Sequence, residues 1–141
     1  MKTIKILILE DDLKTLSVIT NGLFDLEESL FEERINFAIT VFSEYISVEN
    51  YLNQIKNPDF DIVLLDRDCK LAGSFHVINV EKFGVDKFIT ISTQPEYNDA
   101  AKKMGVKRVV RKDYKHLDEF CINLIKEINE LVDEWSAKNS E

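Results

Sequence analysis

The chain has 141 residues, of which 45% are hydrophobic, and this suits one ordinary domain with one apolar core. Its formal net charge of -8 argues against nucleic acid as a direct partner, because phosphate binding needs clustered lysine and arginine. No apolar run approaches the roughly 20 residues that a membrane-spanning helix needs, and the N-terminus lacks a signal-peptide pattern. We therefore expect a single cytoplasmic domain over residues 1–141, without membrane contact.

Strand and helix patterns alternate along the whole chain. Gly84 and Gly105 each follow a helical pattern and precede a strand pattern, where a left-handed backbone is easiest for glycine. The pattern predicts, in chain order and with approximate bounds, a strand over 3–9, a helix from 13, a strand over 35–42, a helix over 47–57, a strand over 60–65, a short helix over 75–83, a strand over 86–92, a helix over 96–104, a strand over 106–111 and a long helix over 114–137. We expect Asp113 to cap this last helix.

Five strands that alternate with helices indicate an α/β fold with a parallel sheet covered on both faces. The first, third and fourth strands are almost wholly apolar and should lie in the middle, whereas 35–42 and 106–111 include polar residues and should lie at the edges. This ranking predicts a doubly wound, flavodoxin-like sheet with strand order 2-1-3-4-5. Such sheets bind ligands beyond the carboxyl ends of the strands, at the switch point between strands 1 and 3.

Chemically active side chains follow successive predicted strands. Glu10 and Asp11 follow the first strand, Asp66 the third, Ser92 the fourth and Lys112 the fifth, so a parallel sheet would place all of them at one rim. Two carboxylates about 4 Å apart repel by roughly 4 kcal/mol at an effective dielectric constant near 20. Such a cluster calls for a cation, and oxygen ligands favour Mg²⁺ where a phosphoryl group completes the coordination shell.

A carboxylate beside Mg²⁺ can attack phosphorus and form an acyl phosphate if the charge on the transferred group is held from several sides. Lys112 can donate to a phosphoryl oxygen or, before transfer, to Asp66, and Ser92 can donate its hydroxyl to another oxygen. Taken singly, each residue has an ordinary structural explanation, as when Asp12 caps the helix after it. Four matches at successive strand ends favour a phosphoryl-accepting site.

The order and spacing of these residues resemble the receiver domain of two-component response regulators over nearly the whole chain. The resemblance implies that Glu10, through water, and Asp11, directly, hold Mg²⁺. It also implies that Asp66 is the phosphoacceptor and a metal ligand, and that the backbone carbonyl of Asp68 is a further ligand.

The resemblance further implies that Ser92 is the switch hydroxyl and that Lys112 contacts the phosphoryl group or the acceptor carboxylate. The implied function is that of a stand-alone response regulator rather than an enzyme. Such a protein accepts a phosphoryl group from a histidine kinase or phosphotransfer protein and signals to a downstream protein by direct contact.

Three residues depart from the family pattern. Asp113 follows the lysine, where receivers usually have a proline joined by a cis bond; a cis bond without proline costs about 2.5 to 4 kcal/mol, so we expect a trans bond and a re-aimed Lys112. Val109 occupies the position of an aromatic residue that turns inward when the hydroxyl moves. Thr93 replaces the customary alanine or glycine.

Residues 102–115 concentrate positive charge in a chain that is otherwise acidic. Seven cations against Asp113 alone give a local charge of +6 (Lys102, Lys103, Lys107, Arg108, Arg111, Lys112 and Lys115). This stretch is either a solvated face or a docking surface for an acidic partner or a second copy of the chain. The apolar end of the last helix is a second candidate for a homodimer contact.

Two other functions compete with phosphoryl-accepting signalling. Asp66-Arg67-Asp68 resembles the Asp-x-Asp nucleophile motif of haloacid-dehalogenase-type phosphatases, in which Asp68 would be the general acid. That family, however, places its nucleophile on the first strand and an acidic pair last. The third hypothesis is a receiver-like scaffold that is never phosphorylated, which the departures at Asp113 and Val109 favour.

Overall fold

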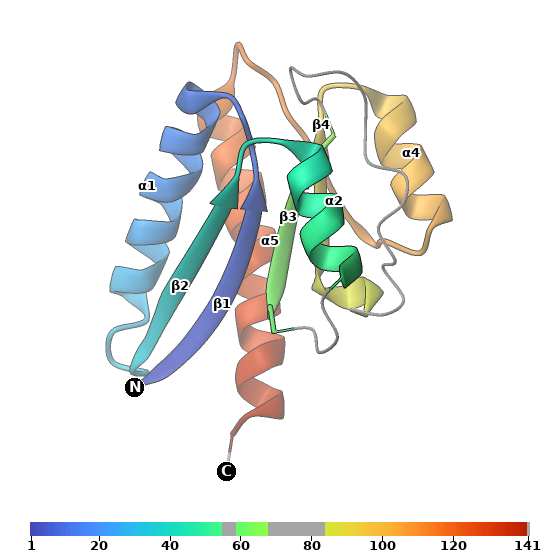
Figure 1. Cartoon of the computed structure of the whole chain (residues 1–141). Coiled ribbons are helices and arrows are strands. Elements are labelled where there is room, and N and C mark those ends of the chain that lie inside the picture. Colours follow the sequence, from blue (N-terminus) through green and yellow to red (C-terminus); the bar gives the residue numbers. More distant parts are fainter. Residues whose placement is uncertain (55–58, 68–83, 141) are drawn as a thin grey trace.

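The computed structural model describes residues 1–54, 59–67 and 84–140. Its strands form one parallel sheet in the order β2-β1-β3-β4-β5, as the sequence predicted (Figure 1). The strands are β1 (Lys2–Leu9), β2 (Ile35–Phe42), β3 (Ile62–Asp66), β4 (Phe88–Ser92) and β5 (Arg108–Arg111). The helix predicted over 75–83 lies outside the described residues, and so does Asp68.

Helices cover both faces of the sheet, with α1 and α5 on one face and α2 and α4 on the other (Figure 1). The helices are α1 (Leu13–Ser29), α2 (Tyr45–Gln54), α4 (Pro95–Lys103) and α5 (Leu117–Lys138), and a 3₁₀ turn, η1 (Val85–Lys87), precedes β4. No helix in the described part of the chain is long and apolar enough to span a membrane.

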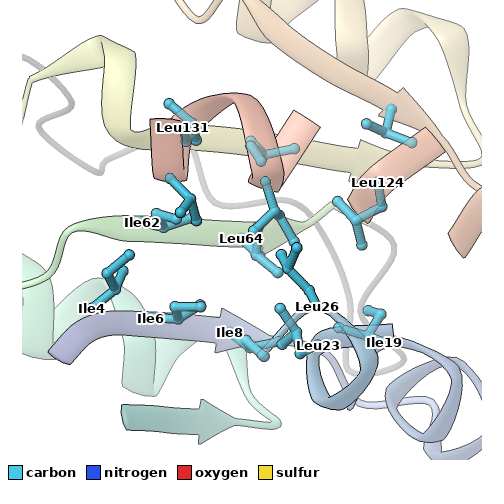
Figure 2. Packing of buried hydrophobic residues seen from close by; sticks show 14 of the residues in the cluster. Ile4, Ile6, Ile8, Ile19, Leu23, Leu26, Ile62, Leu64, Leu124 and Leu131 are labelled. Atoms are coloured by element: carbon cyan, nitrogen blue, oxygen red, sulfur yellow. The ribbon is translucent and has the colours of Figure 1, made fainter. Parts of the chain in front are cut away.

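The central strands are buried on both sides because successive side chains point to opposite faces of the sheet. Ile6 and Leu64 face α1 and α5, where they pack with residues such as Leu124 (Figure 2). Leu7 and Leu65 face α2 and α4. Because burial of each such side chain stabilises the fold by about 1.5–3 kcal/mol, these apolar runs determine which strands are central.

The ends of the helices confirm the predictions for Asp12 and Gly105 but not the prediction for Asp113. Asp12 caps α1, since its carboxylate accepts hydrogen bonds from Thr15 N at 2.9 Å and Thr15 Oγ1 at 2.6 Å. Gly105 follows α4 with a φ of +96°, as predicted for a left-handed helix end. The expectation for Asp113 is wrong, because its carboxylate accepts from Lys115 N at 2.9 Å and closes a turn before α5, which begins at Leu117.

The approach of α1 to α5 leaves no space for a side chain at Gly22. A Cβ atom built there would lie 2.7 Å from Cys121 Sγ and 2.8 Å from Ile125 Cγ1. Overpacking costs about 1–3 kcal/mol, which exceeds the gain of about 1 kcal/mol in helix propensity from glycine to alanine. We predict that Gly22→Ala lowers the free energy of unfolding in urea by about 1 kcal/mol, whereas Asn21→Ala on the exposed side of α1 does not. A stabilised Gly22→Ala variant would contradict the packing.

Candidate functional site

Three carboxylates meet at the carboxyl edge of the sheet. Glu10 and Asp11 directly follow β1, and Asp66 is the last residue of β3, the neighbouring strand. One carboxylate oxygen from each residue lies within 4.8 Å of the other two. Glu10 and Asp66 are buried, at 1% and 0% exposure, whereas Asp11 is partly exposed and links the pocket to solvent.

Lys112 brings a positive charge into this pocket from the end of β5. Its side chain is fully buried, and Nζ donates to Glu10 Oε1 and to Asp66 Oδ1, each at 3.1 Å. The described peptide bonds include no cis bond, so the Lys112–Asp113 bond is trans as expected. The expectation of a re-aimed Lys112 is wrong, because its long side chain reaches Asp66 from a trans backbone.

Burial and neighbouring charges shift the pKa values of Glu10 and Lys112. Burial, assisted by the charge of Asp66, raises the pKa of Glu10 to about 8, although Lys112 and the backbone N–H of Asp12 oppose the shift. Burial alone would lower the pKa of Lys112, but the carboxylates of Asp66 and Glu10 outweigh it and raise this pKa. Three acids against one lysine leave the pocket with an excess of negative charge.

The donor set suits a hard divalent cation. Carboxylate oxygens are the ligands that Mg²⁺ prefers, and three of them converge here with more negative charge than Lys112 balances. Glu10 Oε2 accepts from the backbone N–H groups of Asp11 and Asp12 at 3.0 and 3.1 Å, which holds this side chain at the rim. Asp68, whose carbonyl was expected as a further ligand, lies outside the described residues.

Ser92 lies on the strand beside Asp66. It is the buried last residue of β4, and Asp66 pairs with Ile91, the residue before it. Ser92 Oγ accepts a hydrogen bond from Gln94 N at 2.9 Å, just before α4 begins. A serine hydroxyl can both donate and accept, and in this bond Ser92 is the acceptor.

Two residues next to the predicted site, Tyr114 and Arg67, were not predicted from the sequence. The ring of Tyr114 has its centroid 5.1 Å from Lys112 Nζ. Arg67 follows Asp66, is only 2% exposed, and its guanidinium lies 5.7 Å from the ring centroid of Tyr97 in α4. A charged residue is seldom so buried, and no local pattern in the sequence signals it.

The cationic stretch 102–115 is less available for docking than its charge suggested. Arg108 pairs with three glutamates of α5, including Glu130 at 2.6 Å and Glu134 at 2.9 Å. Lys112 is buried in the acidic pocket. Lys107 also lies 3.8 Å from Asp86, so three of the seven cations have acidic partners within the chain. The docking surface on this stretch stays a prediction.

No protein-family model and no curated protein sequence matches the chain. Solved structures do match: the bacteriophytochrome response regulator AtBRR has a TM-score of 0.58 at 18% identity, over 93% of this chain and 94% of its own. The Francisella response regulator 1452 receiver domain has a TM-score of 0.58 at 18% identity, over 92% and 97% of the two chains. The non-phosphorylated HemR receiver domain from Leptospira biflexa has a TM-score of 0.55 at 23% identity, over 89% and 94%.

The chain has a receiver-domain fold. Identities this low establish the fold alone, so any statement about the chemistry of this receiver-like chain depends on the side chains at its sheet edge. Those side chains are the three converging carboxylates and the buried lysine between two of them.

Lys112 should be essential to the stability of the pocket. We predict that Lys112→Met lowers the free energy of unfolding by about 3–5 kcal/mol without divalent cations, because it leaves buried carboxylates without their counter-charge. Chemical denaturation measures this effect, and Lys115→Met, in the same loop but exposed, is the matched control. Equal stability of the two variants would show that the buried pairing contributes nothing to the fold.

Proposed function

We propose that the chain is a response-regulator receiver that accepts a phosphoryl group on Asp66 in a Mg²⁺-dependent reaction. The donor would be a histidine kinase or a phosphotransfer protein. The observation that carries this proposal is the convergence of three carboxylates and one buried lysine at the carboxyl edge of a receiver-type sheet.

In this reaction an oxygen of Asp66 attacks phosphorus. An O–P bond forms, the P–N bond to the donor histidine breaks, and the bonding electron pair stays on the departing nitrogen. Lys112 Nζ already contacts Asp66 Oδ1 at 3.1 Å, so it lies within reach of a phosphoryl oxygen attached there. Its charge-assisted hydrogen bond would stabilise negative charge that builds up during transfer.

Glu10, Asp11 and Asp66 would hold the cation, with the carbonyl of Asp68 as an expected fourth protein ligand. When bound, Mg²⁺ supplies positive charge beside the phosphoryl oxygens. Asp11 is the partly exposed member of the set, so the cation would reach solvent on the side of Asp11. Glu10 is held from behind by two backbone N–H groups, which suits a ligand that acts from a fixed position.

Ser92 would report the state of Asp66 to α4. Its hydroxyl oxygen now accepts from Gln94 N at the start of that helix. A phosphoryl group on Asp66 that attracts this hydroxyl would move the chain entering α4 and so alter the surface offered to a downstream protein. Such a ligand-linked shift is typically worth about 1–3 kcal/mol. The half-buried Val109 offers no ring to follow the hydroxyl, so the change would be concentrated at α4.

Labelling with a small phosphodonor tests the proposed acceptor. We predict that acetyl phosphate with Mg²⁺ adds one phosphoryl group to the wild type and to Asp99→Asn, a control on the exposed side of α4, but none to Asp66→Asn. Intact-mass spectrometry measures the addition. Labelling that persists in Asp66→Asn would refute the acceptor assignment. An unlabelled wild type would favour the scaffold, and steady turnover of a phosphate monoester would favour a phosphatase.

Mg²⁺ should also stabilise the folded protein. Binding to the native state alone adds about 2.7 kcal/mol to the free energy of unfolding when Mg²⁺ is at 100 times its dissociation constant. We predict that Mg²⁺ raises the melting temperature of the wild type, whereas the effect is lost in Asp11→Asn. Asp25→Asn, which changes an exposed acid of α1, should respond like the wild type. An equal response in all three proteins would place the cation elsewhere.

A further inference from the structure

The ammonium group of Lys112 has a neighbour that the acceptor chemistry described above does not use. Carboxylates of Glu10 and Asp66 contact it at 3.1 Å, and the ring centroid of Tyr114 lies 5.1 Å from Nζ. An aromatic ring attracts a cation within about 6 Å of its centroid, most strongly where water is excluded. Here the side chain of Lys112 is fully buried.

Tyr114 contacts solvent and also lies beside this buried ammonium group. The tyrosine is 50% exposed, whereas the side chain of Lys112, two residues earlier, is 0% exposed. The ring therefore forms part of the wall that closes the pocket beside β5. Replacing it with a small side chain would admit water to the ammonium group and give a flexible lysine other conformations.

The backbone around Tyr114 is anchored on both sides. Lys112 N donates to Ser92 O at 2.9 Å, which extends the pairing of β5 with β4. Beyond the tyrosine, Asp113 Oδ1 accepts from Lys115 N at 2.9 Å, and Asp113 O accepts from His116 N at 3.0 Å. In this chain a turn closed by an aspartate, rather than by proline, fixes the direction of the tyrosine.

A metal ion would compete with Lys112 for the carboxylates of Glu10 and Asp66, but not for the ring of Tyr114. A cation held by Glu10 and Asp66 would draw those carboxylates away from Lys112 and repel its ammonium group. The attraction of the ring for the ammonium group is unaffected by that exchange. Tyr114 can therefore keep the lysine beside Asp66 when its two carboxylate partners are engaged elsewhere.

We propose that Tyr114 is a positioning residue, whose ring holds the ammonium group of Lys112 beside Asp66 and shields it from solvent. Its effect on phosphoryl transfer rests on the function proposed above. The effect on the lysine itself does not, so the two can be tested separately.

The first measurement follows the ammonium protons of Lys112 by ¹⁵N NMR at neutral pH in the full chain without phosphodonor. Shielded ammonium protons exchange slowly enough to be observed, whereas solvated ones do not. We expect the Lys112 signal, assigned by its loss in Lys112→Met, in the wild type and in Tyr114→Phe. We expect it to vanish in Tyr114→Ala, while Lys115→Ala leaves it unchanged. A signal that persists in Tyr114→Ala would overturn the proposal.

The second measurement is the initial rate of labelling by acetyl phosphate with Mg²⁺. We expect Tyr114→Ala and Tyr114→Leu to be about tenfold slower, equivalent to about 1.4 kcal/mol, and Tyr114→Phe to match the wild type. Circular dichroism checks that each variant is folded.

The role of the ring would be overturned if Tyr114→Leu were labelled as fast as the wild type, or if Tyr114→Phe were as slow as Tyr114→Ala. An unlabelled wild type would refute the proposed function and the kinetic role of Tyr114 with it, whereas normal labelling of all variants would refute the kinetic role alone.

Discussion

The balance of charge in a buried pocket is the constraint on which the carboxyl edge of the sheet depends. Glu10 and Asp66 are removed from water beside Asp11, and Lys112 is the cation that contacts both buried acids. Uncompensated carboxylates in such a place would cost several kcal/mol, a large share of a typical domain stability of about 5–15 kcal/mol. One lysine reduces the excess negative charge without removing it. The arrangement is thus stable enough to fold and still attractive to a divalent cation.

The parallel sheet makes this concentration of charge possible. Apolar runs in β1 and β3 bury those strands side by side, so the residues that follow them must emerge at the same edge. β5 lies two strands away from β3, and the length of the Lys112 side chain bridges that distance. Residues far apart in sequence therefore meet because of the strand order, and the apolar cores on both faces hold that order in place.

Much of the fold could be predicted from the sequence because hydrophobic periodicity and strand composition are strong, redundant signals. Strand order followed from the contrast between apolar central strands and the mixed residues of β2 and β5. Local signals were weaker. Asp113 has the right residue type for a helix cap, but its carboxylate closes a turn instead and α5 begins at Leu117. The geometry of Lys112 was misjudged because a flexible side chain can compensate for a change in backbone conformation. Tyr114 and Arg67 are close to the site in sequence, but only tertiary packing buries Arg67 and brings the ring of Tyr114 near the ammonium group of Lys112.

We propose that Asp11 and Asp66 bind a divalent cation next to the ammonium group of Lys112. Crystals soaked in Mn²⁺, an anomalous scatterer that accepts the same oxygen ligands as Mg²⁺, test it most directly. We expect an anomalous peak in contact with carboxylate oxygens of Asp11 and Asp66, with Lys112 still beside Asp66. A peak elsewhere, such as among the glutamates around Arg108, with none between Asp11 and Asp66, would contradict it.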